Sequence, residues 1–317
     1  MAGVALIPRA EAAPVRGAAY AGRSGPSPKR DFRIVFPRKC EGDTMQIQTI
    51  DTTSGRIACR HSAGSGPTIV ILHGNSASSR AFTPQIESAL GDKYRILVPD
   101  LPGHGDSDDA ADPAGTYNLP GYAAVLHEIV ARLDAADAVF VGWSLGGHIL
   151  LEAAPELAQA RGFAIFGTPP ISFPPAMDQA FLPTPAMAYT FQPDLNEEQA
   201  RAYVAAAFRP GVTDLPAEMV ADVLRTDGRA RGQLATSIRP GGFRDEVAVA
   251  ANLKQPLAVL HGAEEQLVNG AYFDTLTMPT LWRGSVQVID DAGHLPQWEQ
   301  AERFNALLDQ FVAEVAA

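Results

Sequence analysis

Cysteine is scarce in this chain of 317 residues, which contains only Cys40 and Cys59. Two cysteines do not make a disulfide framework, and these two show no metal-ligand spacing. The histidines form neither an H-x-H pair nor an H-E-x-x-H motif, so we expect no metal site and no cofactor. This cysteine usage fits a reducing compartment, and we expect a cytoplasmic protein.

Long apolar runs and an excess of positive charge are also missing. No window approaches the roughly 20 consecutive apolar residues of a membrane-spanning helix, so we expect a soluble protein without a membrane partner. The chain holds 25 Lys and Arg against 36 Asp and Glu, a net charge of −11. Negative charge repels phosphates and argues against a nucleic-acid partner. It does not restrict a small uncharged partner, and no sequence feature specifies an oligomeric state.

Apolar residues are plentiful, at 46% of the chain, so a large core is possible. Residues 1–44 stand apart because they are rich in Ala, Gly, Pro and Arg and have no periodic apolar face. We predict that residues 1–44 form a disordered leader and that the folded unit begins near Met45. The leader lacks the apolar region of a secretory signal, and we favour translated upstream sequence or a flexible tail over a transit peptide.

From Met45 onward, short apolar runs alternate with helical patterns. Continuous apolar strands separated by helices are typical of a mostly parallel sheet covered on both faces. We therefore predict an α/β core, residues 45–168 and 246–317, with eight strands and helices at about 80–90, 119–133 and 148–160. The expected strands are residues 46–50, 56–61, 68–72, 94–98, 138–141, 163–166, 256–260 and 285–289.

Residues 169–245 interrupt this alternation. The segment is first rich in proline and then predicts helices near 196–208, 216–226 and 229–238. It is too long for a loop and too helical for disorder, so we interpret it as an inserted helical cap over the carboxyl ends of the strands. Large apolar and aromatic cap side chains are expected to exclude water from a pocket: Met177, Phe181, Met187, Tyr189, Phe191 and Tyr203.

The most informative stretch is a G-x-S-x-G pattern, Gly142 to Gly146, between a predicted strand and a predicted helix. In a nucleophile elbow of this kind the serine takes a strained backbone conformation and its hydroxyl projects above the sheet. A Cβ on either glycine would collide across the tight turn. We predict Ser144 as the nucleophile, against the simpler interpretation of a solvated serine in a glycine-rich turn.

A serine hydroxyl needs a base and an orienting acid. His294 follows glycine on the loop after the last predicted strand, and Glu264 and Glu265 follow the strand before it. The chain order serine, acid, histidine is that of the α/β-hydrolase triad. We predict Ser144, His294 and Glu265, with Glu264 as the alternative acid. The other histidines are interpreted as packing, surface or loop residues: His61, His73, His104, His127, His148 and His261.

Two further loops end predicted strands. The backbone N–H groups of Asn75 and Leu145 are expected to form a two-donor oxyanion hole, with the Asn75 side chain as a further contact to substrate. The loop that carries Asp100 and His104 precedes the elbow. We assign these two side chains a structural role, in which they bind each other or the backbone.

Together these residues resemble the α/β-hydrolase family from Met45 onward and, within it, the metal-independent serine N-acylhomoserine lactonases. Those enzymes have a glutamate as the triad acid, which implies Glu265, and a cap tyrosine in the pocket, which implies Tyr203. Trp143 either lines the pocket or packs behind it. The supporting stretches are residues 73–79 (HGNSASS), 142–149 (GWSLGGHI), 167–170 (GTPP) and 225–231 (RTDGRAR).

The resemblance implies a quorum-quenching enzyme that opens the lactone ring of N-acylhomoserine lactones through an acyl-enzyme, with an acyl lactone or ester as its small-molecule partner. A carboxylesterase or carbon–carbon bond hydrolase on the same triad is the nearer alternative, because the fold does not specify the acyl group. A receptor of this fold with negligible turnover is the more distant one. Dehalogenase and epoxide hydrolase mechanisms are disfavoured, because they need a carboxylate where Ser144 stands.

Overall fold

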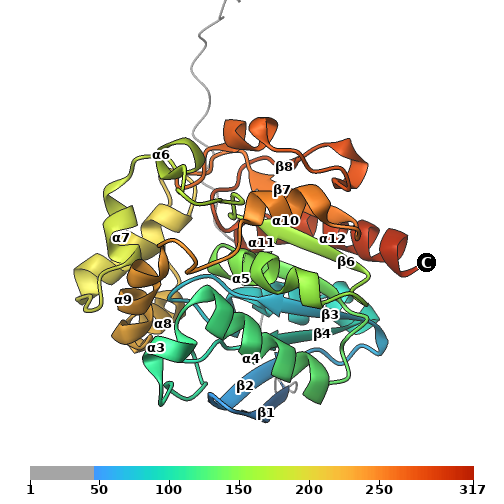
Figure 1. The fold of residues 1–317 in the computed structure, drawn as a ribbon, viewed down its shortest axis with the longest axis horizontal. Coiled ribbons are helices and arrows are strands. Elements are labelled where there is room, and N and C mark those ends of the chain that lie inside the picture. Colours follow the sequence, from blue (N-terminus) through green and yellow to red (C-terminus); the bar gives the residue numbers. More distant parts are fainter. Residues whose placement is uncertain (1–45) are drawn as a thin grey trace, which may run out of the picture. The chain divides into compact units, whose positions relative to one another are not determined.

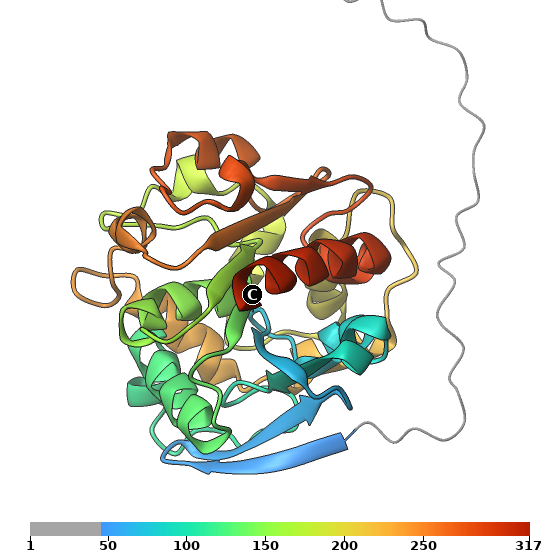
Figure 2. The ribbon, with the colours of Figure 1, turned by 90° about the vertical axis from the view of Figure 1, so that its right-hand side faces the viewer.

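The computed structural model describes residues 46–317, and the predicted leader, residues 1–44, lies outside the described residues. Eight strands form one sheet in the order β1-β2-β4-β3-β5-β6-β7-β8, with helices on both faces (Figure 1, Figure 2). The β1–β2 and β2–β4 pairs are antiparallel and all other pairs are parallel, which confirms the predicted fold class. The strands are β1 (Gln46–Thr52), β2 (Gly55–His61), β3 (Gly66–Leu72), β4 (Tyr94–Pro99), β5 (Val139–Trp143), β6 (Gly162–Phe166), β7 (Leu257–Gly262) and β8 (Gln287–Ile289).

The two faces of the sheet are buried under different helices. Val70 of β3 belongs to the apolar cluster that includes α4 (Leu119–Arg132) and α5 (Leu145–Ala153). Its neighbour Ile71 belongs to the cluster that includes α12 (Ala301–Ala316). Successive strand side chains point to opposite faces, so burial on both faces requires the continuous apolar strands from which the fold class was predicted.

Helix α12 is not among the elements predicted from the sequence. Phe304, Leu307, Leu308 and Phe311 are all buried, and their spacing of i, i+3, i+4 and i+7 is the signal of an amphipathic helix. The helix is 16 residues long. No helix in residues 46–317 is long and apolar enough to cross a membrane.

Two predicted helices are shorter than expected. The segment 80–90 is interrupted because the Ser88 side chain accepts the N–H of Leu90 and so caps a new helix. The helix predicted over 148–160 is α5, which begins directly after Ser144 and is followed by a 3₁₀ turn that contains Pro155. Proline disfavours a helix interior because it lacks an N–H. The short elements are η1 (Ser79–Phe82), α1 (Thr83–Ile86), α2 (Ala89–Lys93) and η2 (Ala154–Glu156).

Between β6 and α10 (Glu246–Asn252) the chain leaves the sheet and forms several helices, which gather at the left of Figure 1. Buried Arg231 anchors them to the core by donating to the Ser76 hydroxyl at 3.1 Å. Arg80 of the core contacts Asp222 at 2.8 Å. The elements are α6 (Met177–Ala180), η3 (Pro185–Thr190), α7 (Glu197–Ala207), α8 (Ala217–Arg225) and α9 (Gly228–Ser237), of which the last three lie where helices were predicted.

The loop after β4 is held by its own polar side chains. Asp100 accepts the N–H groups of Ser79 at 2.6 Å and Asp106 at 2.8 Å. The Nδ1 atom of His104 donates to the Pro102 carbonyl at 3.0 Å. Asp100 and His104 therefore bind the backbone, and not each other, which is one of the two structural roles predicted for them.

The buried imidazole of His104 predicts a loss of stability in acid. Burial, reinforced by neighbouring His73, lowers the pKa of His104 to about 3. The unfolded chain binds this proton near the ordinary imidazole pKa of about 6.5, so this contribution to stability is present above pH 6.5 and is lost as the pH falls towards 3. We expect protonation of His104 in the unfolded chain to lower the free energy of unfolding by about 2 kcal/mol between pH 7 and pH 5.

Urea unfolding at pH 7 and pH 5 tests this expectation against the variant His104→Gln, whose side chain can still donate to the Pro102 carbonyl. The variant should lose about 2 kcal/mol less than the wild type between the two pH values. An equal loss in both proteins would show that protonation of His104 does not contribute.

Candidate active site

Ser144 lies where strand β5 turns sharply into helix α5. Its backbone angles are φ 52° and ψ −118°, a strained combination for a residue with a side chain. A Cβ on Gly142 would lie 2.5 Å from the Cα of Gly147, and a Cβ on Gly146 would collide with the Leu72 carbonyl oxygen. Glycine is therefore required at both positions, and the turn has the geometry of a nucleophile elbow.

His294 and Glu265 contact each other directly and are both buried. The Nδ1 atom of His294 lies 2.8 Å from Glu265 Oε2, and the side chains are 6% and 2% exposed. Burial raises the pKa of Glu265, but the His294 charge and hydrogen bond, together with the N–H of Leu267, outweigh burial and lower this pKa below its usual value. The carboxylate thus holds the proton on Nδ1 of the imidazole. Glu264 is exposed, so Glu265 is the glutamate that contacts His294.

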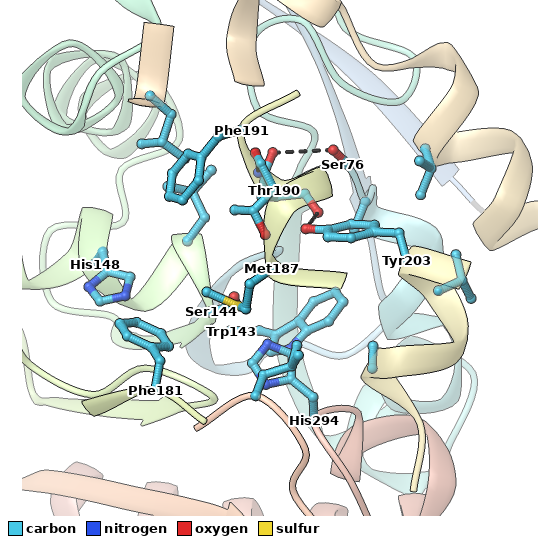
Figure 3. A pocket seen from close by; sticks show the side chains of 18 of the residues that line it. Ser76, Trp143, Ser144, His148, Phe181, Met187, Thr190, Phe191, Tyr203 and His294 are labelled. Atoms are coloured by element: carbon cyan, nitrogen blue, oxygen red, sulfur yellow. Dashed lines mark hydrogen bonds between the residues drawn. The ribbon is translucent and has the colours of Figure 1, made fainter. Parts of the chain in front are cut away.

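Ser144 and His294 line the same cavity (Figure 3). The ring of Trp143, the residue before the serine, lies 5.8 Å from the His294 ring between centroids. Gly167 follows strand β6 with φ 60°, and a Cβ there would come within 2.5 Å of His294 Cε1. Gly167 therefore makes room for the imidazole. This requirement was not predicted from the sequence, in which a glycine directly after a buried strand is the only signal for it.

The loop after strand β3 brings Asn75 to the serine. A Cβ on Gly74 would lie 3.2 Å from the Cβ of Ser144, so this loop passes directly beside the elbow. Leu145 is the first residue of α5, and an N–H at this position has no acceptor within its helix. Asn75 and Leu145 both line the cavity. This placement suits the two-donor oxyanion hole predicted from the sequence.

The side chain of Asn75 is already hydrogen-bonded. Its Nδ2 donates to the Thr190 carbonyl at 2.9 Å, and its Oδ1 accepts from the Ser76 hydroxyl at 3.3 Å. Figure 3 shows Ser76 and Thr190 at the upper end of the cavity. The backbone N–H of Asn75, and not its amide, is therefore the group better placed to bind a developing negative charge.

The walls of the cavity are mainly apolar and come from both the core and the helices after β6. Tyr203 lines the cavity with its hydroxyl 3.4 Å from the Asn75 carbonyl. Trp143 also lines it, and its indole N–H has no hydrogen-bond partner in the part of the chain that the structure describes. Of the six predicted cap side chains, the five that line the cavity are Met177, Phe181, Met187, Phe191 and Tyr203.

Tyr189 does not line the cavity, so its predicted place in the pocket is wrong. It lies in the 3₁₀ helix η3, in which residues three apart share a face. Met187 and Thr190 occupy the face that lines the cavity, and Tyr189 therefore lies on another face.

Two of the remaining histidines have specific contacts. His73 accepts the N–H of Leu101 at 2.9 Å and donates to the Gly74 carbonyl at 2.8 Å, which connects two loops beside the site. His148 lines the cavity and contacts Glu246, so its interpretation as a packing or surface residue is incomplete. Within residues 46–317 no group of three or more His, Cys, Asp or Glu residues could hold a metal ion.

Residues 69–307 match the Alpha/beta hydrolase family. The chain therefore belongs to the α/β-hydrolase family, the class of protein that its sheet order and its serine turn define. Among solved structures it is similar to the N-acyl homoserine lactonase AidH in complex with N-hexanoyl homoserine lactone, at 36% identity and a TM-score of 0.82, over 86% of this chain and 98% of that one. The AidH complex with N-butanoyl homoserine matches at 37% identity and the same TM-score, over 86% and 97% of the two chains. The resemblance to the N-acylhomoserine lactonases is confirmed.

Other relatives are esterases. The pimeloyl-(acyl-carrier protein) methyl ester esterase of Xanthomonas campestris pv. campestris strain B100 is 29% identical over 262 residues, which cover 79% of this chain and 96% of that protein. A thermophilic esterase from Thermogutta terrifontis shares the fold, with a TM-score of 0.69 at 21% identity over 86% of this chain and 100% of that one. The matches to lactonase and esterase together support an enzyme that hydrolyses esters.

Proposed function

We propose that this chain is a serine hydrolase that opens the lactone ring of N-acylhomoserine lactones, a quorum-quenching activity. The observation that carries the proposal is the similarity to AidH over nearly the whole length of that chain, at 36% identity. The cavity lined by Ser144 and His294 is also mainly apolar, as an acyl tail requires. A lactone is an internal ester, so the same chemistry serves both groups of relatives.

In the proposed reaction, the Ser144 hydroxyl attacks the ring carbonyl carbon and His294 Nε2 takes the hydroxyl proton. The N–H groups of Asn75 and Leu145 stabilise the oxyanion. The bond between the carbonyl carbon and the ring oxygen then breaks, and His294 returns the proton to that oxygen.

The same imidazole then takes a proton from a water molecule, whose oxygen attacks the carbonyl carbon of the acyl-enzyme. The bond from this carbon to Ser144 Oγ breaks, His294 returns the proton to Ser144, and the N-acylhomoserine is released. Glu265 orients His294 and stabilises its charged form in both halves of the reaction. Tyr203 and Trp143 contact the substrate from the cavity wall. These roles need no metal, so activity is expected to survive dialysis against a chelator.

A carboxylesterase acting on simple esters is the second candidate, favoured by the 29% identity to the methyl ester esterase. Carbon–carbon bond hydrolysis on the same triad, and binding of an acyl ligand without turnover, are further alternatives that the fold permits.

The assay that separates these functions compares N-hexanoyl homoserine lactone with p-nitrophenyl butyrate. We expect ring opening, followed as one acid equivalent released per lactone, with a kcat/KM above that for the simple ester. Ester turnover without ring opening would identify a carboxylesterase. Tight binding of the lactone without turnover of either compound would identify a receptor, and loss of activity to a chelator with recovery in zinc would contradict the metal-free mechanism.

A further inference from the structure

A second histidine–carboxylate pair lies beside the cavity, and the proposed mechanism does not use it. The Nδ1 atom of His148 lies 3.0 Å from Oε1 and 2.9 Å from Oε2 of Glu246. Glu246 is completely buried at the start of helix α10, whereas His148 is 14% exposed and lines the cavity (Figure 3). The pair joins residues 98 positions apart in the sequence.

The position of His148 on helix α5 brings its ring towards the nucleophile. His148 is four residues after Ser144, and its N–H contacts the Ser144 carbonyl at 3.3 Å. Side chains on a helix lean towards its N-terminus, and Ser144 directly precedes the first residue of α5. The imidazole therefore covers the turn that begins at Ser144, next to the place where a substrate carbonyl is attacked.

The contact with Glu246 determines what the ring offers to the cavity. A carboxylate only accepts hydrogen bonds, so Nδ1 of His148 carries a proton and donates to it. In the neutral ring Nε2 is then an acceptor, and it makes no hydrogen bond to any residue in 46–317. Nε2 of His148 can therefore accept a hydrogen bond from a donor on the substrate.

Two other side-chain acceptors of the cavity wall, on Asp222 and Asn75, are already engaged. Both oxygens of Asp222 are occupied, one by the Ser78 hydroxyl and the other by Arg80. The Oδ1 atom of Asn75 accepts from Ser76. His294 is assigned to proton transfer. His148 is the ring-nitrogen acceptor that remains for a substrate N–H close to the scissile carbonyl.

The geometry points to His148 as a specificity-determining residue that accepts a hydrogen bond from the amide N–H of an N-acylated substrate, with Glu246 as its positioning residue. This assignment rests on the proposed function, because the amide nitrogen of an N-acylhomoserine lactone is attached to the carbon next to the ring carbonyl. A carbonyl carbon placed at Ser144 puts this N–H within reach of a side chain one helical turn away. Simple esters lack the donor and gain nothing from His148.

Glu246 also has a purely structural contact, which decides the choice of variants. Its N–H donates to the Ile171 carbonyl and its Oε2 accepts the Ile171 N–H, each at 2.9 Å. These bonds join the two ends of the segment between β6 and α10, so replacing Glu246 would disturb more than the imidazole. The variants are therefore His148→Phe, which keeps a ring without an acceptor, and His148→Gln, whose amide can donate to Glu246 and still present a carbonyl oxygen.

The test uses two substrate pairs in which CH₂ replaces the amide N–H. The lactone pair is N-hexanoyl homoserine lactone and α-(2-oxoheptyl)-γ-butyrolactone. The acyclic ester pair is ethyl N-hexanoylglycinate and ethyl 4-oxononanoate. We expect wild type to prefer the amide of each pair by about tenfold in kcat/KM, the value of one hydrogen bond, and mainly through KM. His148→Phe should abolish the preference by lowering kcat/KM for the amide-containing member of each pair only. His148→Gln should restore most of the preference.

The two pairs separate failure of this assignment from failure of the lactonase proposal. If neither lactone is opened but the acyclic pair shows a preference that His148→Phe removes, the lactonase proposal fails and the role of His148 stands. If lactones are opened with no preference for the amide, or if His148→Phe slows both members of a pair equally, His148 has only a structural role. Hydrolysis of none of the four compounds by wild type would overturn both proposals.

Discussion

Ser144→Ala is expected to lower kcat/KM for every ester and lactone substrate by about 10⁵-fold or more, the loss typical of a removed serine nucleophile. The hydroxyl forms the covalent bond to substrate in the proposed mechanism, and alanine has no atom that replaces it. The methyl group fits the same backbone turn, so the cavity should keep its form and the affinity for substrate should change little. Steady-state hydrolysis and calorimetric binding of N-hexanoyl homoserine lactone measure the two quantities separately.

Ser237→Ala is the matched control for this variant. Ser237 lines the same cavity, but its hydroxyl donates to the Leu234 carbonyl of its own helix at 2.8 Å. Its replacement removes no group that the proposed mechanism uses, so kcat/KM should stay within about threefold of wild type, or about 0.6 kcal/mol in the activation free energy. Turnover by Ser144→Ala at more than about one per cent of the wild-type rate would remove Ser144 from the mechanism.

Glu265→Gln is expected to lower kcat by about 10⁴-fold, as does amide replacement of the carboxylate in other triads. Glutamine is nearly the same size, and its carbonyl oxygen can still accept the N–H of Leu267. Its NH₂ group would then face Nδ1 of His294, which favours the tautomer with the proton on Nε2. An imidazole with that proton cannot accept the proton of Ser144, so the nucleophile is no longer activated.

Glu264→Gln provides the control, because it makes the same chemical change at the neighbouring exposed position. Its activity should match the wild type, and the thermal unfolding of both variants should be measured to detect a loss of folding. Equal activity in the two variants would contradict the role of Glu265. A large loss in Glu264→Gln alone would move the triad acid to the alternative that the sequence left open.

The fold was predictable to a large extent because its signals are local. Each central strand is an apolar run of a few residues, and the turn at Ser144 is marked by a glycine two residues to either side of the serine. The predictions were wrong where one local sequence pattern is compatible with two structures. The segment 80–90 reads as one helix, yet the cap at Ser88 divides it. Tyr189 is aromatic like its neighbours in the cavity wall, but its position around the 3₁₀ helix places its side chain on a face away from the cavity.

The site was predictable only in part. Ser144 and His294 each follow a strand in a recognisable loop, but Glu264 and Glu265 are adjacent and alike, and only burial against His294 distinguishes them. The space that Gly167 leaves for the imidazole, and the contact of His148 with Glu246, involve residues distant in sequence. No local pattern encodes such distances.

The amino-acid order alone determined the class of fold, the elbow and the candidates for base and oxyanion hole, because strand burial and a tight turn constrain consecutive residues. Tertiary structure decided which glutamate meets the imidazole, which cap side chains face the cavity and which second histidine lies beside the serine. Those outcomes depend on how helices and loops pack around the sheet, and packing joins side chains that the sequence separates by tens to hundreds of positions.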